Sequence, residues 1–598
     1  MIIKAMLAAA ALLAAVPLAA ADYRDRLPQD EVIYFLLPDR FDNADRSNDR
    51  GGLSGDRLAT GFDPADKAFY HGGDLQGVVR RLDYIQGLGA TAIWLGPVFV
   101  NKPVQGAPGH ESAGYHGYWI TDFTHVDPHL GTDADFAALV AAAHARGMKV
   151  YMDIIANHTA DVIRYRECPA NDCVYRSRAD YPYQRRARDG APINAGFAGD
   201  ADHGAANFAT LTDPSYAYTV EVPPAEAHVK VPAWLNDPIY YHNRGNSTFT
   251  GESSTMGDFA GLDDLMTEHP RVVAGMIEIY DDWVDRGIDG FRIDTAKHVN
   301  AAFWQAFVPA MLARAKARGV PNFHIFGEVA TGGNDPALLA EHTRVDKLPS
   351  VLDFAFRRAV IDAVTSGASD GLAKLFDADV LYEGGAEAAQ RLPTFVSNHD
   401  NGRLAFELRR ALPRATPEEL LQRVLLANAM LLTLRGVPTI YAGDEQGFVG
   451  TGGDQDARQD MFASQVAAYN NDLRLGTTQT TATDSFDATH PLYREIARLA
   501  RLRTTTAALR RGRQLMRFAS DRPGLFAATR VDPDTGAEVV LAFNTSGTTV
   551  DVNVEVGVGS TRFVSLAGVC PATARAPGSA AFRLPPFGYA VCSAQVKR

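Results

Sequence analysis

The sequence predicts an α/β protein: a (β/α)₈ barrel with an irregular domain inserted after the third strand and an antiparallel β-sandwich at the C-terminal end. Three observations favour this fold. Short apolar segments alternate with amphipathic ones from residue 31 to about residue 503. One interval between two predicted strands is far too long for a single βα connection. Near residue 511 the pattern changes to short strands and turns. Repeated βα units of this number are typical of a barrel whose active site lies where the strands end.

The expected barrel strands are short apolar segments followed by polar residues. They lie at 32–37, 92–95, 149–155, 291–293, 323–326, 351–354, 394–396 and 439–441. Helices are expected between them. Thr132 and Asp135 have the spacing of a capping box, and Gly147 is expected to end the helix that follows.

The interval between the third and fourth strands holds about 130 residues, where a βα unit needs far fewer. This segment is rich in Tyr, Asn, Asp, Gly and Pro and lacks helical periodicity. We therefore expect these parts: a signal peptide at 1–21, the first part of the barrel at 22–158, an inserted domain at 159–262, the second part of the barrel at 263–508 and a β-sandwich at 509–598.

Composition sets the first limits on function. The 598 residues are 46% hydrophobic and 22% charged, which are ordinary values for a folded globular chain. The net charge is -13 and there is no long basic run, which argues against nucleic acid or an anionic membrane as the main partner.

The N-terminal segment is typical of a secretory signal peptide. Lys4 precedes an apolar stretch that ends in Ala19, Ala20 and Ala21, the expected cleavage point. A membrane anchor is the weaker reading because the stretch is rich in Ala, contains Pro17 and is too short to span a bilayer. We expect a secreted or periplasmic protein with no membrane association after cleavage.

Export makes the four cysteines interpretable as two local disulfides, Cys168 with Cys173 and Cys570 with Cys592. A zinc site is the alternative, but neither pair has His or further Cys at ligand spacing.

Carboxylates follow three of the predicted strands. Asp294 ends the fourth strand, Glu328 follows the fifth and Asp400 follows the seventh. Any one of them could simply cap the next helix. Together, with Arg292 two residues before Asp294 on the same side of its strand, they indicate glycoside cleavage, which needs one carboxylate as nucleophile and another as acid.

These segments resemble the signature regions of the α-amylase family of glycoside hydrolases, family 13. The matching stretches are 152–158, 290–298, 326–328 and 395–400, supported by 89–97, 115–119 and 584–589. The resemblance implies that Asp294 is the nucleophile, Glu328 the general acid and base, and Asp400 the third carboxylate, which bonds the sugar hydroxyls. It further implies substrate contacts from His116, Tyr118, His158, Arg292, Lys297, His298 and His399.

The same resemblance implies calcium as a structural cofactor. One site would use Asn157, Asp264 and the backbone carbonyl of His298, between the barrel and the inserted domain. A second would use a loop seen in cyclodextrin-forming relatives, through Asn43, Asp45, Asn48, Asp49, Asp74 and the carbonyl of Gly72. Oxygen ligands suit this cation. A solvated acidic turn is the alternative for the second group.

The resemblance implies retaining hydrolysis of internal α-1,4 bonds in starch, maltodextrins and related α-glucans. Cyclomaltodextrinase and cyclodextrin glucanotransferase are alternatives within the family, and a non-catalytic glucan-binding protein is the alternative from another class. Hydrolysis is favoured over cyclisation because Ala260 stands where cyclising relatives carry an aromatic residue, and because such relatives continue into further domains. Phe259 could still supply a ring. Oligomeric state is left open.

Overall fold

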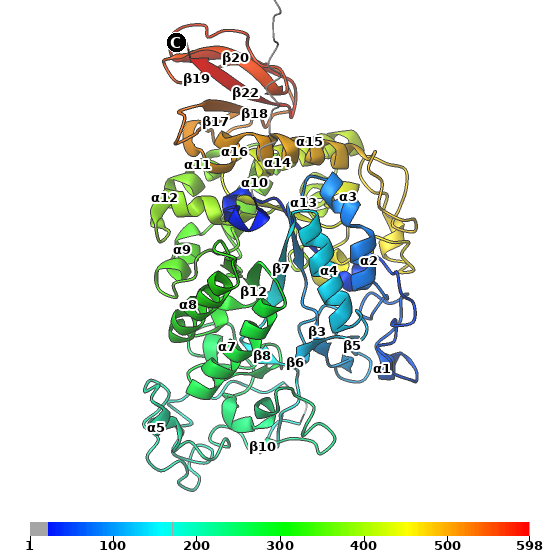
Figure 1. Cartoon of the computed structure of the whole chain (residues 1–598), viewed down its shortest axis with the longest axis vertical. Coiled ribbons are helices and arrows are strands. Elements are labelled where there is room, and N and C mark those ends of the chain that lie inside the picture. Colours follow the sequence, from blue (N-terminus) through cyan, green and yellow to red (C-terminus); the bar gives the residue numbers. More distant parts are fainter. Residues whose placement is uncertain (1–21, 170–171, 597–598) are drawn as a thin grey trace, which may run out of the picture.

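The computed structural model describes residues 22–169 and 172–596. The predicted signal peptide lies outside the described residues. The C-terminal strands form one end of the molecule, and the segment carrying α5 (Ala205–Phe208) and β10 (Val220–Glu221) forms the other, with the barrel between them (Figure 1). Among the described residues, no helix is long and apolar enough to cross a membrane.

The predicted parallel barrel is present. Its sheet runs in the order β13-β12-β7-β2-β1-β15-β14, and each neighbouring pair is parallel. The strands are β1 Ile33–Leu36, β2 Ala92–Leu95, β7 Lys149–Ile154, β12 Gly290–Ile293, β13 His324–Gly327, β14 Pro393–Thr394 and β15 Val437–Tyr441.

The predicted sixth strand at 351–354 is wrong in length. Only Val351 forms a bridge, to Gly327, because the Asp353 side chain accepts a hydrogen bond from Phe356 N and starts helix α10, Phe354–Thr365. The short segment still closes the barrel. Leu352 N donates to Gly327 O at 2.9 Å on one side, and Asp353 N donates to Pro393 O at 2.9 Å on the other.

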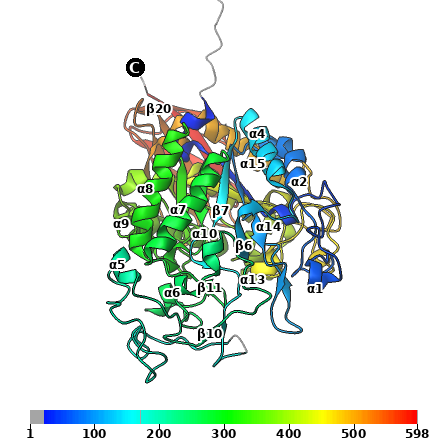
Figure 2. The same cartoon turned by 60° about the horizontal axis from the view of Figure 1, so that its bottom comes forward.

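Alternation along the strands builds two cores. Ile33 and Phe35 of β1 point into the barrel with Trp94, Tyr151 and Phe326, whereas the residues between them face the surrounding helices. Figure 2 shows α7 and α8 lying alongside β7 on the outside of the barrel. The longer helices of this layer are α4 Asp133–Ala145, α7 Pro270–Asp285, α8 Ala301–Ala317, α9 Pro336–Arg344, α11 Asp370–Asp377, α13 Leu404–Ala411, α14 Pro417–Thr433 and α15 Pro491–Thr505.

Helix α4 shows how local sequence sets an element boundary. Thr132 Oγ1 accepts from Asp135 N, and the Asp135 side chain accepts from Thr132 N, so the predicted capping box is confirmed. Gly147 follows the helix with a positive φ of 68°. The helix therefore delivers the chain to β7, which carries part of the site.

The segment between β7 and helix α7 contains only short elements. Its strands and α-helices are β8 His158–Thr159, β9 Arg164–Tyr165, α5 Ala205–Phe208, β10 Val220–Glu221, α6 Ser253–Met256 and β11 Asp263–Asp264. Strands β8 and β11 pair antiparallel where the chain leaves and re-enters the barrel. A hairpin of β3 Phe99–Asn101 and β6 Ile120–Val126 lies on the same side, with β4 Val104–Gln105 and β5 Ser112–Ala113 between its strands in the sequence.

The C-terminal part is antiparallel, as predicted. One sheet runs β16-β17-β18-β22-β20 and a second pairs β19 with β21. The strands are β16 Arg513–Phe518, β17 Leu525–Val531, β18 Glu538–Asn544, β19 Val550–Glu555, β20 Ser560–Ala567, β21 Ser579–Leu584 and β22 Tyr589–Val596. Residues of both sheets share one apolar cluster, which makes the pair a sandwich. Both predicted disulfides are confirmed, Cys168 with Cys173 and Cys570 with Cys592.

Candidate active site

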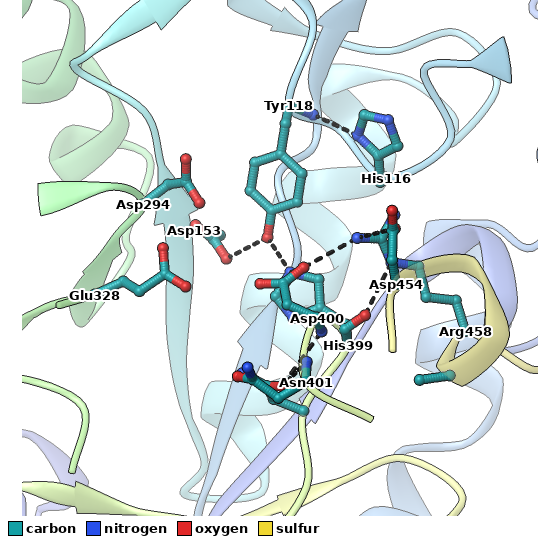
Figure 3. A network of polar contacts seen from close by, with 12 residues as sticks. His116, Tyr118, Asp153, Asp294, Glu328, His399, Asp400, Asn401, Asp454 and Arg458 are labelled. Atoms are coloured by element: carbon teal, nitrogen blue, oxygen red, sulfur yellow. Dashed lines mark hydrogen bonds and ion pairs between the residues drawn. The ribbon is translucent and has the colours of Figure 1, made fainter. Parts of the chain in front are cut away.

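The three carboxylates predicted from the sequence meet in one cleft at the C-terminal ends of the barrel strands. Asp294, Glu328 and Asp400 all line this cleft, which has a volume of about 510 Å³. Asp294 N donates to Ile154 O and Glu328 N donates to Ile293 O, so the strand ladder itself fixes both residues. Figure 3 shows Asp294 and Glu328 on one side, with Asp400 opposite them.

A single guanidinium connects two of these carboxylates. Arg292 is fully buried, and its Nη1 lies 2.8 Å from Asp294 Oδ1 while its Nη2 lies 3.1 Å from Glu328 Oε2. Retaining glycoside cleavage requires two carboxyl groups about 5 to 5.5 Å apart. Because the two carboxylates contact the two terminal nitrogens of one guanidinium, Arg292 holds them close to each other.

Burial dominates the protonation of this pair. Removal from water raises the pKa of Glu328, as expected for a group that must carry a proton. Burial likewise raises the pKa of Asp294 well above its usual range, although the Arg292 charge pulls it down. The Arg292 charge therefore does not outweigh burial at Asp294, and the two neighbouring carboxyls titrate as an interacting pair.

Asp400 has a different environment. Its Oδ1 lies 3.0 Å from Arg458 Nη2 and 3.4 Å from His399 Nε2. Burial disfavours the charged form of Asp400, yet these neighbours outweigh that cost and lower its pKa. Because burial lowers the pKa of His399 to about 3 and keeps its ring neutral, Arg458 is the cation that stabilises the Asp400 carboxylate.

Three of the histidines predicted to contact substrate are neutral hydrogen-bonding groups: His116 and His158 line the cleft, and His399 lies behind it, beside Asp400 and Tyr118. Burial lowers the pKa of His116 well below its usual range and that of His158 to about 3. His158 Nε2 is buried without a partner in the described residues, and so is His399 Nδ1. A buried nitrogen without a hydrogen-bond partner destabilises the folded protein, and a sugar hydroxyl that bonds to it would remove this penalty.

The remaining predicted contacts are also placed in or beside the cleft. The ring of Tyr118 stacks on His116 at 5.5 Å between centroids, and its hydroxyl bonds His399 Nε2 at 2.7 Å. Lys297 Nζ donates to Ala330 O at 2.7 Å, and His298 Nδ1 lies 2.7 Å from Ser254 O. Lys297 and His298 line the cleft side that carries the ring of Phe259.

Sequence reasoning missed several residues of the cleft. Arg458 contacts both Asp400 and Asp454. It lies in a loop well past β15, so its position in the sequence, away from any strand end, did not indicate a place in the cleft. Phe249 stands edge-on to Phe259 at 5.2 Å and comes from the inserted domain, where no periodicity could place it. Gln105 and Trp119 complete the wall.

Two residues of the second predicted calcium site carry side-chain oxygens without a partner. Asn43 Oδ1 and Asn48 Oδ1 are buried and have no partner in the described residues. Asn43 Nδ2 donates to Asp49 Oδ1 at 2.8 Å, and a Cβ at Gly72 would lie 2.5 Å from both of these atoms. Asp74 accepts from Ala44 N and Asp45 N and thereby ties the loop to α2, Leu75–Arg80. The donor set is all oxygen, which fits calcium.

In the first predicted calcium site, a protein side chain already bonds one of the proposed ligand oxygens. Asp264 pairs with His158 across β11 and β8, next to Asn157, but its Oδ2 already bonds His242 Nδ1 at 2.6 Å. Burial would lower the pKa of His242, yet Glu268 and Asp264 outweigh it and raise that pKa to about 10. The described residues contain no group of three or more His, Cys, Asp or Glu side chains arranged to hold a metal.

Comparisons with known proteins agree with this geometry. The family model for the α-amylase catalytic domain matches residues 35–517. An α-amylase of Streptomyces lividans is 48% identical over 520 residues, which cover 86% of this chain and 55% of that protein. The chain thus spans about half the length of this relative.

Two solved structures cover nearly the whole chain. An α-amylase of Geobacillus thermoleovorans, complexed with acarbose, is 25% identical with a TM-score of 0.67 and covers 96% of this chain and 100% of its own. A cyclomaltodextrin glucanotransferase with a three-domain distribution is 26% identical with a TM-score of 0.68 and covers 95% and 99%. The second match removes one of the two reasons for favouring hydrolysis over cyclisation, because a cyclising enzyme need not carry further domains.

Proposed function

The chain belongs to the α-amylase family of glycoside hydrolases, and from this premise we propose that it hydrolyses internal α-1,4-glucosidic bonds of starch and maltodextrins with retention of configuration. The observation that carries the proposal is the Arg292 bridge between Asp294 and Glu328, with Asp400 facing them across the cleft. All three acidic side chains of the family pattern are present, which argues against a non-catalytic glucan-binding protein.

In the first step, Asp294 attacks the anomeric carbon and Glu328 gives its proton to the glycosidic oxygen, so the leaving chain departs as a neutral alcohol. The product is a glycosyl ester on Asp294. In the second step, Glu328 takes a proton from water, the water oxygen bonds to the anomeric carbon, and Asp294 leaves as a carboxylate. Asp400 stays ionised beside Arg458 and accepts hydrogen bonds from the sugar hydroxyls as the ring distorts.

Neutral histidines and an aromatic face would bind the sugar at this position. His158 and His399 each offer a ring nitrogen that lacks a partner, and Tyr118 presents a ring between two imidazoles. Neutral donors suit an uncharged sugar because they hydrogen-bond without the cost of burying a charge. Lys297 and His298 would contact the leaving chain.

A cyclodextrin-active enzyme is the second candidate, favoured by one observation. Phe259 stacks on His158 at 5.5 Å and meets Phe249 and His298 edge-on, so the cleft has aromatic rings despite Ala260. Aromatic rings bind sugar faces. A longer acceptor chain held there could compete with water for the glycosyl intermediate.

Products from soluble starch, β-cyclodextrin and pullulan separate these candidates. An α-amylase should abolish iodine staining of starch rapidly and release mixed linear oligosaccharides, while β-cyclodextrin reacts slowly. Faster opening of β-cyclodextrin would favour a cyclomaltodextrinase, and formation of cyclic products from starch would favour a glucanotransferase. Absence of reaction with all three substrates would reject the enzyme proposal.

We further propose that calcium stabilises the fold through the loop 43–49 and, more weakly, through Asn157, Asp264 and the His298 carbonyl. Support comes from the two unpartnered oxygens of Asn43 and Asn48 and from a raised pKa of Asp49, which burial and nearby carboxylates cause. When bound, the ion would cross-link loops and supply no catalytic chemistry.

Chelation should therefore lower the melting temperature, by about 1 to 2 °C if calcium binding contributes about 1 to 2 kcal/mol, since the shift per kcal/mol falls as the unfolding unit grows. Differential scanning calorimetry with and without EDTA measures this. Asn48→Ala should reduce the EDTA response, whereas Asn470→Ala, outside both groups, should leave it unchanged. A transition that EDTA does not move would count against both sites.

Export through the N-terminal segment is likewise a proposal, supported by two disulfides that persist in oxidising compartments.

A further inference from the structure

Asp153 lies in β7, in register with Arg292 of the neighbouring strand β12, and it is completely buried. It does not line the cleft, so its effect on the reaction would act through the side chains that it contacts. Its two oxygens nevertheless bond three side chains. Oδ1 accepts from Arg292 Nη1 at 2.7 Å, and Oδ2 accepts from Trp94 Nε1 and from the Tyr118 hydroxyl, both at 3.1 Å.

Two of these partners reach the reacting groups. Arg292 contacts Asp294 and Glu328, and Tyr118 contacts His399 at the wall of the cleft. One carboxylate therefore fixes both a cation and an aromatic ring on which the proposed reaction depends. Figure 3 shows Asp153 beside the Tyr118 hydroxyl, on the side of Asp294 and Glu328.

Asp153 and Asp294 contact the same nitrogen of Arg292. The same nitrogen, Nη1, lies 2.7 Å from Asp153 and 2.8 Å from Asp294. One positive charge thus lies against three carboxylates, Asp153, Asp294 and Glu328. Each carboxylate reduces the electrostatic stabilisation that Arg292 gives to the other two. The titratable groups that face Asp153 are Tyr118, Tyr280, Arg292, Asp294 and Glu328.

We propose that Asp153 is a positioning residue for the reaction, which holds Arg292 and Tyr118 in place and competes with Asp294 for Nη1 of Arg292. This inference rests on the proposed function. Asp153 would thereby determine how strongly the Arg292 charge stabilises the ionised form of the nucleophile, Asp294.

The charge state of Asp153 supports this assignment. Burial raises the pKa of Asp153 to about 7, although Arg292 and Trp94 pull it down. Asp153 also contributes to the raised pKa of Asp294, after burial and Glu328. Removing the Asp153 charge should therefore lower the pKa of Asp294, since a neighbouring negative charge disfavours ionisation.

The test is Asp153→Asn, which keeps the shape and one acceptor oxygen. The nucleophile must be ionised, so the acidic limb of kcat/KM against pH for maltoheptaose should move to lower pH by at least about half a unit. We also expect kcat to fall about tenfold with a smaller change in KM, because Arg292 and Tyr118 are held less firmly.

Asp353→Asn is the matched control. Asp353 is also fully buried and bonds an arginine, Arg435, but it does not line the cleft. This variant should lower the melting temperature and leave the pH limb where it is. A folded Asp153→Asn protein with the wild-type limb would overturn the inference, while an inactive wild type would instead reject the proposed function.

Should Asp153→Asn fail to fold, Trp94→Phe provides a second test. It removes the Nε1 donor to Asp153 Oδ2 and keeps an aromatic ring against Phe35. The charged form of Asp153 then loses a hydrogen bond, so the acidic limb should move in the same direction by a smaller amount. A limb that moves to higher pH or does not move contradicts the inference.

Discussion

Asp294→Asn should lower kcat/KM on maltoheptaose by about 10⁴-fold or more, because the amide cannot form the glycosyl ester through which the reaction proceeds. Initial rates from pH 4 to 9 measure the loss. The fold should survive, and the melting temperature should not fall, because the change removes one of several negative charges that share Arg292.

A matched control for this variant is Asp454→Asn, which also lines the cleft and pairs with Arg458. Its side chain is 67% exposed and contacts no residue of the proposed nucleophile pair, so we expect a loss below about tenfold. If Asp294→Asn kept more than about one per cent of wild-type activity, Asp294 could not be the nucleophile.

The second large effect is expected from Glu328→Gln. Starch hydrolysis should fall by about 10³-fold or more, since the leaving oxygen is no longer protonated and water is no longer activated. The alkaline limb of the pH profile should disappear as well. That limb reports the proton on Glu328, which the wild type loses as the pH rises through the raised pKa.

Two substrates make the Glu328 prediction specific. α-Maltosyl fluoride has a leaving group that needs no proton, so its first step should continue in Glu328→Gln. The intermediate should then accumulate, and added azide should release it as the α-glycosyl azide. Asp294→Asn should show neither effect. Unchanged starch hydrolysis in Glu328→Gln would remove Glu328 from its role.

The barrel and its three carboxylates were predictable because the information is local. Each barrel strand is a short apolar segment, and the polar residue that follows it must lie at the cleft. The alternation of Ile33 and Phe35 with outward-facing residues fits the same logic. The sixth strand was predicted too long because the apolar residues after Asp353 belong to a capped helix.

The rest of the cleft comes from loops, whose positions depend on tertiary contacts. Arg458 reaches Asp400 from a loop with no periodic pattern, and Phe249 adopts a positive φ of 60° in the inserted domain. His242 could not be foreseen as the partner of Asp264, because 22 residues and a change of element separate them. Such contacts require the folded backbone.

Electrostatics was predicted least well. The sequence placed Arg292 on the same side of its strand as Asp294, but it could not show that Asp153 contacts the same nitrogen or that burial outweighs the cation. The domain count was also a poor guide to product, as the three-domain glucanotransferase demonstrates.

The central claim is that Asp294, Glu328 and Asp400 act on a single sugar ring. A crystal structure of Glu328→Gln with bound maltoheptaose tests it most directly. We predict one glucose with its anomeric carbon about 3 to 3.5 Å from an Asp294 oxygen, its glycosidic oxygen beside residue 328 and its hydroxyls bonded to Asp400. An oligosaccharide bound with no ring in contact with both Asp294 and Asp400 would contradict the account.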